Sequence, residues 1–297
     1  MKKFEKSSVK NILSIDPFSL NEGVKYAISN NISSLAIKPL NAYAEYGFSD
    51  PKELYKIKLD TTNIIENKKI EELSFSDHIN LSKNDIENLY TLENLKSLSF
   101  KNKTFKLDFC FLTQLEKLNF KYNKGVTNLN TLHNLKELLI ISLSESNLIN
   151  LSNLESLITL RLTRGNFISV EGIENLKIER LDINYNNKIK DINPIGKLSN
   201  LKVLNIEKCK QLTDFSFLSK NSSIRELFID NLDSIEFISS MPNLEKINFW
   251  FSKDGNMKPL LESKSLKQIN FYPNKKHYSH TIEEIIETTG AQRGRNK

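Results

Sequence analysis

The sequence predicts an α/β fold in which short strands and tight turns alternate and stack as a repeat solenoid. Three observations predict this class. The pattern apolar-x-x-apolar-x-apolar occurs twelve times between residues 32 and 271 of the 297-residue chain. All 36 positions of the pattern hold apolar residues, whereas an apolar share of 39% would fill about 14 of them by chance. The copies are nearly evenly spaced, and many segments between them carry an apolar residue at every third position.

The copies recur with a period that is typical of solenoids. From Leu95 onward they start 20 to 23 residues apart, whereas earlier spacings of 16 and 25 residues predict irregular coils. One unit cannot bury its apolar face alone, so neighbouring units must stack. The twelve copies start at Ile32, Leu54, Ile70, Leu95, Leu115, Leu135, Leu157, Ile178, Leu201, Ile224, Leu244 and Leu266.

Each unit combines a strand with tight turns. Within the pattern, the last two apolar positions alternate with other residues, which predicts a short strand with one buried face. In the second part of many units, apolar residues follow at intervals of three, which suits 3-10 turns because residues i and i+3 eclipse there. The longest such series is Ile189, Ile192, Ile195, Leu198 and Leu201.

These units resemble the leucine-rich repeat superfamily, in its short class of about 22 residues per repeat. The bacterial internalins and the phosphatase-regulatory leucine-rich repeat proteins belong to this class. The resemblance covers residues 32–271. It implies a curved solenoid with a concave parallel β-sheet of about 12 short strands, 3-10 segments and loops on the convex side, and a cap at each end.

The chain departs from the family pattern at one position of the repeat. Eight residues after each start, the pattern expects Asn, Cys or Thr, whose side chain satisfies backbone groups of the loop. Asn123, Asn186, Cys209 and Asn274 fit, and Thr62 is a further candidate, whereas Lys103, Leu143, Gly165, Leu232 and Ser252 do not fit. We therefore expect irregular convex loops.

Helical caps are expected at both ends of the solenoid. The N-terminal cap, residues 1–31, contains a predicted helix over 16–30 with Asp16 as N-cap and Pro17 as first residue. The C-terminal cap, residues 272–297, contains a capping box of Thr281 and Glu284, a stop at Gly290 and a basic tail that we expect to fray. No linker interrupts the chain, so we expect one continuous domain.

Several function classes are disfavoured by composition. The two cysteines, Cys110 and Cys209, exclude a disulfide scaffold, and the nine glycines fit no phosphate-binding motif. His277 and His280 lack an evident third ligand, so neither a metal nor a cofactor is expected. No nucleophile–base pair can be argued, which predicts a non-enzymatic protein. The start carries no apolar signal region and no membrane span is visible, so a cytoplasmic location is expected.

The residues that face outward from the predicted sheet are those at the third, fifth, seventh and eighth positions of each unit. In early units they are basic, and in late units they are acidic and aromatic. Aromatic anchors flanked by charge are typical of protein-binding hot spots. The candidate partner-binding residues are Leu139, Ile141, Arg161, Arg164, Asp182, Tyr185, Glu207, Phe228, Asp230, Trp250 and Tyr272.

The pattern favours a non-enzymatic module that binds a protein partner on its concave face. The resemblance includes bacterial proteins that inhibit a toxin of the same cell as immunity proteins, and the Lys, Asn and Ile richness is typical of AT-rich bacterial genomes. A scaffold or regulatory subunit is one alternative. A nucleic-acid-binding solenoid is another, supported by the net charge of +6, but Asp182, Glu207, Glu226 and Asp230 interrupt the basic face.

Overall fold

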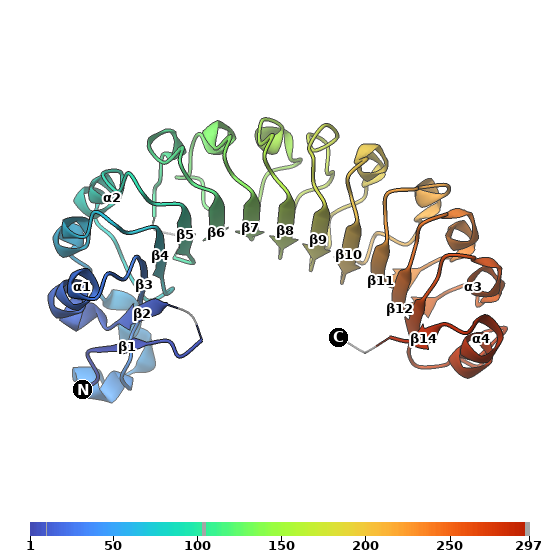
Figure 1. Ribbon diagram of the computed structural model, residues 1–297, viewed down its shortest axis with the longest axis horizontal. Coiled ribbons are helices and arrows are strands. Elements are labelled where there is room, and N and C mark those ends of the chain that lie inside the picture. Colours follow the sequence, from blue (N-terminus) through green and yellow to red (C-terminus); the bar gives the residue numbers. More distant parts are fainter. Residues whose placement is uncertain (10, 103–104, 295–297) are drawn as a thin grey trace. The chain divides into compact units, whose positions relative to one another are not determined.

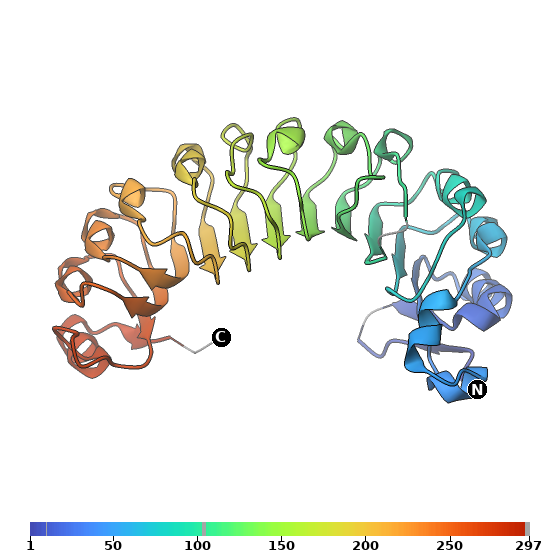
Figure 2. The same ribbon diagram turned by 180° about the vertical axis from the view of Figure 1, so that it is seen from behind.

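The computed structural model of the chain describes residues 1–9, 11–102 and 105–294 (Figures 1 and 2). The chain divides into two compact units. The N-terminal unit comprises Met1–Ile141 and Asn153–Ser156, and the C-terminal unit comprises Ser142–Ser152 and Leu157–Lys297. In each unit, taken by itself, the strands line the concave side and the helices and turns lie on the opposite side. The predicted single-domain organisation stays a prediction.

The described part of the N-terminal unit contains seven strands in chain order. The first two pair antiparallel, and each later strand pairs in parallel with the strand before it. Equivalent repeat positions lie opposite one another, as Leu73 does with Leu98. The strands are β1 (Phe4–Lys6), β2 (Ile12–Ile15), β3 (Ser34–Ile37), β4 (Glu72–Phe75), β5 (Ser97–Phe100), β6 (Lys117–Lys121) and β7 (Glu137–Ile141).

The described part of the C-terminal unit also contains seven strands, all parallel to their neighbours. Two of them, β11 and β12, reach seven residues each and form the longest pair of this unit. The strands are β8 (Thr159–Thr163), β9 (Arg180–Asn184), β10 (Val203–Glu207), β11 (Glu226–Leu232), β12 (Lys246–Ser252), β13 (Gln268–Phe271) and β14 (Gln292–Arg293).

The sides opposite the strands are built from short helices. The α-helices are α1 (Leu20–Ser29), α2 (Lys83–Leu89), α3 (Lys258–Glu262) and α4 (Ile282–Thr289). The 3-10 helices are Pro17–Ser19, Tyr43–Tyr46, Pro51–Lys56, Thr61–Glu66, Phe109–Phe111, Leu129–Thr131, Ile149–Leu151, Asn193–Lys197, Ser216–Leu218 and Glu236–Ser240. The predicted fold class, a leucine-rich repeat solenoid of short parallel strands and 3-10 turns, is confirmed.

The core lies between the strands and the turns, as the apolar pattern requires. Residues at the first, fourth and sixth repeat positions are buried except Leu54 and Leu266, which are half-buried, and the three-residue series from Ile189 to Leu201 is buried as well. Aromatic rings fill part of the N-terminal core. Phe100 lies 5.1 Å from Phe105 and 5.5 Å from Phe120, measured between ring centres. Stacked rings at this distance add to the free energy gained by burying them.

The predicted strand at 54–59 is wrong. β3 pairs directly with β4, and residues 51–56 form a 3-10 helix instead. The Asp50 carboxylate accepts a hydrogen bond from the Lys52 N–H at 2.7 Å, and Pro51 fits the first helical position. The apolar residues Ile57 and Leu59 are buried all the same. The copy of the pattern that starts at Leu54 therefore lies outside the sheet, in the connection between β3 and β4. This extra copy accounts for the short spacing of 16 residues between Leu54 and Ile70.

The N-terminal cap contains more strand than predicted. The Asp16 carboxylate caps the 3-10 helix that leads into α1 by accepting from the Phe18 N–H at 3.1 Å, close to the expected boundary. Residues 12–15, however, form β2, whose Leu13 and Ile15 are fully buried. The repeat pattern does not identify this strand, because Lys10 occupies the position where the pattern requires its first apolar residue.

The C-terminal cap follows the prediction as far as α4. The Thr281 hydroxyl accepts from the Glu284 N–H at 3.3 Å, and the Glu284 carboxylate accepts from the Thr281 N–H at 2.7 Å. Gly290 ends the helix in the left-handed region, with φ of 72°. Arg293, expected in a frayed tail, lies instead in β14, which pairs with β13. Residues 295–297 of the tail, and Lys103, lie outside the described residues.

Of the four residues that fit the family pattern eight residues after a repeat start, three contact backbone carbonyls as expected. The Asn186 amide donates to the Phe167 carbonyl at 3.0 Å, and the Asn123 amide donates to the Phe105 carbonyl at 2.9 Å. Cys209 contacts the Ile183 carbonyl at 3.6 Å. Asn274 instead accepts from the Ile282 N–H at 3.1 Å and so supports the start of α4.

Candidate partner-binding face

The fifth repeat positions form a continuous row across the strands of the C-terminal unit. Strand pairing places each member opposite the next, so their side chains stand side by side on the concave face. The row consists of Arg161, Asp182, Asn205, Phe228, Asn248 and Asn270. Two charged groups, one aromatic ring and three amides thus make up this row.

Asp182 is the anchor of this row rather than an exposed contact residue. The sequence predicts an outward-facing carboxylate, but Asp182 is only 6% exposed. Its Oδ2 atom lies 3.1 Å from Arg161 Nε and 3.0 Å from Arg180 Nε, and its Oδ1 atom accepts from the Asn205 amide. Flanking arginines therefore cover the carboxylate and compensate its burial.

The aromatic group on this face differs in one member from the prediction. Phe228, expected to be exposed, is only 7% exposed because the Trp250 ring packs edge-on against it, with ring centres 5.7 Å apart. Trp250 itself is 38% exposed, and Tyr272, the residue that follows β13, is 60% exposed. Trp250 and Tyr272 are the seventh residues of neighbouring repeat units, and we refer to them as the exposed aromatic pair; Phe228 lies beneath Trp250.

The ends of β8, β9 and β10 carry residues with left-handed backbone. Arg164, Tyr185 and Lys208 have φ of 55°, 57° and 53°. The Arg164 N–H donates to the Asn184 carbonyl at 2.9 Å, and the Tyr185 N–H donates to the Glu207 carbonyl at 2.8 Å. These bonds to the next strand hold both side chains at the strand ends, where Arg164 and Tyr185 are exposed.

Asp230 is another predicted contact residue that turns out to be buried, at 5% exposure. Its carboxylate accepts from the Lys208 N–H at 2.8 Å. At the preceding strands a backbone carbonyl takes this role, but β11 continues past Asp230 to Leu232, so the side chain replaces the carbonyl. Asp230 therefore supports the backbone of the face, and it is not available to a partner.

Tyr185 and Lys208 form a pair at the strand ends. The Lys208 ammonium donates to the Tyr185 hydroxyl at 3.1 Å and lies 4.8 Å from the centre of its ring. This hydrogen bond raises the pKa of Lys208 above its usual range. Glu207, which is half-buried, lies 3.9 Å from the same ammonium. Tyr185, Lys208 and Glu207 thus form one connected cluster.

The remaining predicted contact residues, Leu139 and Ile141, lie on β7 of the N-terminal unit. Both are half-buried, and strand pairing places them opposite Asn119 and Lys121 of β6. The basic early face is less free than the sequence predicts, because Lys117 pairs with Glu137 at 2.9 Å. That Leu139 and Ile141 contact a partner stays a prediction.

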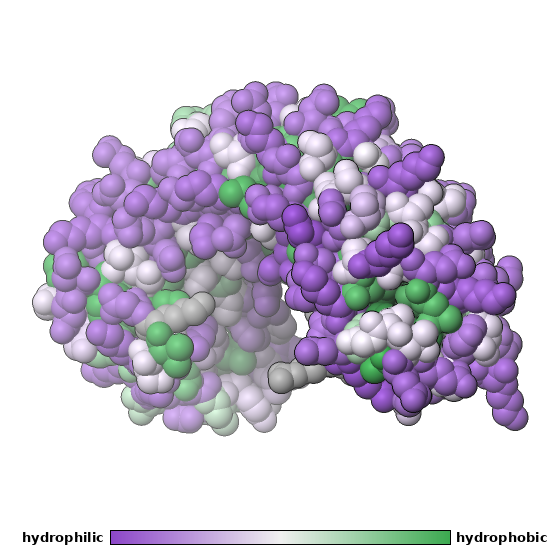
Figure 3. All heavy atoms as spheres, turned by 45° about the vertical axis from the view of Figure 1, so that its right-hand side comes forward, coloured by the Kyte–Doolittle hydropathy of each residue, from purple (hydrophilic) through white to green (hydrophobic). Residues whose placement is uncertain are grey.

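A shallow hollow of about 170 Å³ lies on the concave face of the C-terminal unit. Phe228 forms part of its wall, and the ion pair of Lys246 with Glu226, at 2.6 Å, closes one side. Asn205, Asn248, Gln268 and Asn270 also line it. On the side of this unit that faces the viewer in Figure 3, small groups of hydrophobic residues lie among hydrophilic ones.

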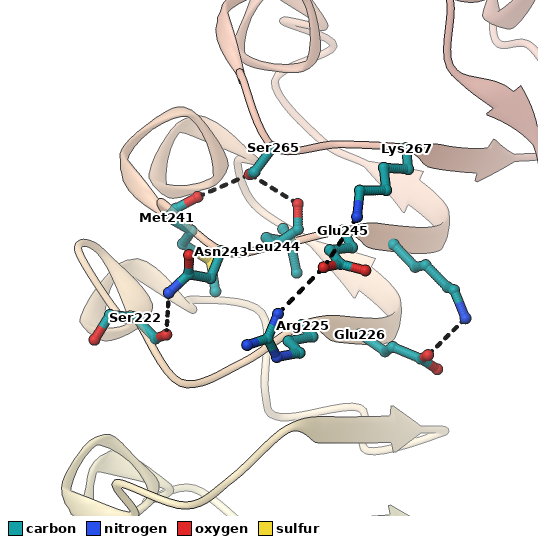
Figure 4. Close-up of polar contacts among 10 residues, drawn as sticks. Ser222, Arg225, Glu226, Met241, Asn243, Leu244, Glu245, Ser265 and Lys267 are labelled. Carbon is teal, nitrogen blue, oxygen red and sulfur yellow. Dashed lines mark hydrogen bonds and ion pairs between the residues drawn. The ribbon is translucent and has the colours of Figure 1, made fainter.

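A second set of polar contacts, outside the concave row, joins the segments that lead into β11, β12 and β13. The Asn243 amide donates to the Ser222 carbonyl at 2.7 Å, and the Ser265 hydroxyl donates to the Leu244 carbonyl at 2.8 Å (Figure 4). Arg225 and Lys267 each lie 3.2 Å from the same Glu245 oxygen. The hydrogen bond from Lys267 is the main cause that lowers the pKa of Glu245.

The described residues contain no group of three or more His, Cys, Asp or Glu side chains that could hold a metal ion. His277 bonds to the Ser252 carbonyl at 3.0 Å, and His280 bonds to the Ser279 hydroxyl. Burial raises the pKa of the Cys209 thiol to about 11, which makes it a poor nucleophile. Within the described residues, no helix is both long enough and apolar enough to cross a bilayer.

Comparison with known proteins agrees with the repeat architecture. Residues 176–220 match the family model for leucine-rich repeats in two copies. An internalin from Listeria monocytogenes has 12% identity and a TM-score of 0.51, and the match covers 97% of this chain and 88% of that one. A leucine-rich repeat protein from Leptospira interrogans has 17% identity and a TM-score of 0.57, with 95% and 76% covered.

Among curated proteins, the sequence has no significant match. The low identities to the solved structures establish the fold alone. The repeats and the parallel strands with 3-10 turns are those of the leucine-rich repeat fold, and the family-model match over residues 176–220 agrees with it.

Proposed function

We propose that the chain is a non-enzymatic module that binds a protein partner on the concave face of its C-terminal unit. The observation that carries this proposal is the exposed aromatic pair of Trp250 and Tyr272 beside buried Phe228. Large aromatic side chains on an otherwise polar face are favoured anchors of protein interfaces. The leucine-rich repeat fold commonly serves as a protein-interaction surface, which agrees with this reading.

The surroundings of the aromatic pair support a protein partner. The hollow that Phe228 helps to line is bordered by amides and by the paired charges of Lys246 and Glu226, and these suit neutral hydrogen-bonding groups. Such polar groups around an aromatic anchor resemble the rim of a protein interface. We propose Arg161, Arg164 and Tyr185 as further contacts of the same unit, and Leu139 and Ile141 as contacts of the N-terminal unit.

The finer proposal is that this binding inhibits the partner, as an immunity protein neutralises a cognate toxin in the bacterial cytoplasm. It is supported by the bacterial origin of the similar solved structures and by the composition of the chain. Co-expression tests it: the chain should restore growth to cells that produce the toxin encoded beside its gene. Growth that stays arrested, together with no binding to that toxin, would favour a scaffold or regulatory subunit instead.

The nucleic-acid alternative is less favoured. Asp182 and Asp230 interrupt the face less than the sequence predicts, because both are buried and held by basic or backbone groups. Glu207 and Glu226 remain partly accessible on the same face and would repel a continuous phosphate backbone. Steep loss of binding with added salt would identify a nucleic-acid partner, whereas a protein anchored by aromatic rings should depend weakly on salt.

The binding-face variant W250A/Y272A tests the proposed function directly. Its affinity for a purified partner, identified by capture from the native cell, should fall at least about tenfold, as is usual when hot-spot aromatics are truncated. The matched control is F111A, which removes an exposed aromatic ring from the turn side of the N-terminal unit. Calorimetry that gives equal affinities for wild type, W250A/Y272A and F111A would contradict the proposal.

A further inference from the structure

Two arginines of the C-terminal unit share one buried carboxylate. Arg161, on β8, and Arg180, on β9, both approach the Oδ2 atom of Asp182 with their Nε atoms, at 3.1 and 3.0 Å. Asp182 is 94% buried, and its other oxygen accepts from the Asn205 amide. The carboxylate thus fixes both guanidinium groups from beneath through the nitrogen nearest the side-chain stem.

The outer ends of both guanidinium groups remain open to solvent. The side chain of Arg161 is half exposed and that of Arg180 is one-third exposed. Within the described part of the chain, no Nη nitrogen of either arginine donates a hydrogen bond. Two positive charges face one negative charge here, so the cluster keeps an excess of positive charge.

This arrangement matches the requirements of an oxyanion site. A guanidinium group presents its N–H donors in a planar fork that fits the two oxygens of a carboxylate. Holding a long arginine side chain in place usually costs conformational entropy when a ligand binds. The buried Asp182 carboxylate has already fixed both side chains, which lowers that cost.

We propose that Arg161 and Arg180 form a preorganised site for a carboxylate on an acidic side chain of the protein partner. The proposal rests on the proposed protein-binding function and specifies the chemistry of one contact. A single carboxylate fits better than a phosphate backbone, because Glu207 and Glu226 on the same face would repel a continuous polyanion. Asp182 acts as the positioning residue, and it does not contact the ligand.

Arg225 provides a matched control within the same unit. It also belongs to an ion pair, with Glu245 at 3.2 Å, but it contacts the carboxylate through a terminal Nη1 nitrogen (Figure 4). Its partner carboxylate is about one-third exposed, whereas Asp182 is buried. The arginine charge is the same at both places, whereas the orientation of the guanidinium fork and the burial of its anchor differ.

The test uses the whole chain and a capped tripeptide with one glutamate between two glycines, titrated by nuclear magnetic resonance of arginine side-chain nitrogens. Saturable shifts at Arg161 and Arg180 are expected with this peptide and not with its glutamine analogue. The double variant R161K/R180K keeps both charges but loses the forks, so its affinity should fall about tenfold. R225K should stay within about twofold of wild type.

Three outcomes would overturn the inference: no shift with the glutamate peptide, an equal loss in R225K, or full affinity in R161K/R180K. Tighter binding of an oligouridylate than of the peptide at the same two arginines would assign the site to nucleic acid and overturn it as well. The titration requires no partner. If the titration fails but W250A/Y272A still loses the partner, the carboxylate site is refuted and the proposed function stands. If W250A/Y272A retains the partner, the proposed function is refuted, whatever the titration shows.

Discussion

Trp250 covers Phe228 across two paired strands, with ring planes at 70° and ring centres 5.7 Å apart. Phe228 lies at the fifth repeat position, on β11, and its register partner on β12 is Asn248. Trp250 lies two residues beyond Asn248. Both strands continue to seven residues, so the Trp250 position is still held by the sheet. Trp250 therefore shields Phe228 from water while it stays partly exposed itself. The same two rings thus contribute to stability and to the proposed binding face.

Truncation of the two rings should have unequal and coupled effects on stability. We expect F228A to lower the free energy of unfolding by about 3 kcal/mol, because it empties a nearly buried site, and W250A to lower it by about 1 kcal/mol. The double variant should lose about 1 kcal/mol less than the sum, because the edge-on contact is lost only once. Urea unfolding of all four proteins measures this coupling, and strictly additive losses would show that the rings do not support each other.

Asp230 should be a structural residue and not a binding residue. Its buried carboxylate accepts from the Lys208 N–H, so D230A leaves that donor without its partner and should cost about 2 kcal/mol of unfolding free energy. D230N keeps an acceptor oxygen and should recover more than half of the loss. Urea unfolding of the two variants separates hydrogen bonding from charge. An equal loss in both would mean that the negative charge, rather than the acceptor, stabilises this strand end.

The fold could be predicted from the sequence because each repeat carries its own apolar pattern. The strands from β3 to β13 follow from residues within a single unit, such as Leu98 and Phe100 in β5. The segment at 54–59 shows the limit of this reasoning. Ile57 and Leu59 are buried as the pattern requires, but Asp50 and Pro51 start a 3-10 helix that removes the segment from the sheet.

The candidate site was harder to predict because its exposure depends on neighbouring repeats. Phe228 stands at an outward position, and the ring of Trp250 in the next unit packs over it. Asp182 is likewise buried by arginines that come from two different strands. A repeat pattern defines the direction of a side chain within one unit, whereas contacts between units decide whether water reaches it.

Stability should fall at alkaline pH because of Cys209. Burial raises the pKa of its thiol from 9.0 to about 11, so between these values the unfolded chain loses a proton that the folded chain keeps. The stabilisation is complete below pH 9 and is lost as the pH rises toward 11, by about 2 kcal/mol. C209A should remove this part of the decline between pH 8.5 and 10.5. The control C110A alters an exposed thiol, and an equal effect of both variants would refute the assignment.

The capping box of the terminal helix should contribute measurably to stability, because α4 covers the end of the C-terminal unit with the buried residues Ile282 and Ile285. T281A removes the hydroxyl that accepts from the Glu284 N–H, and we expect a loss of about 1 kcal/mol of unfolding free energy. T281S keeps the hydroxyl and should stay within about 0.5 kcal/mol of wild type. T288A is the control within the same helix, because its hydroxyl donates to the Glu284 carbonyl, a local bond that adds little to helix stability. Urea unfolding that ranks T288A as more damaging than T281A would show that the helix start is not where this cap gains its stability.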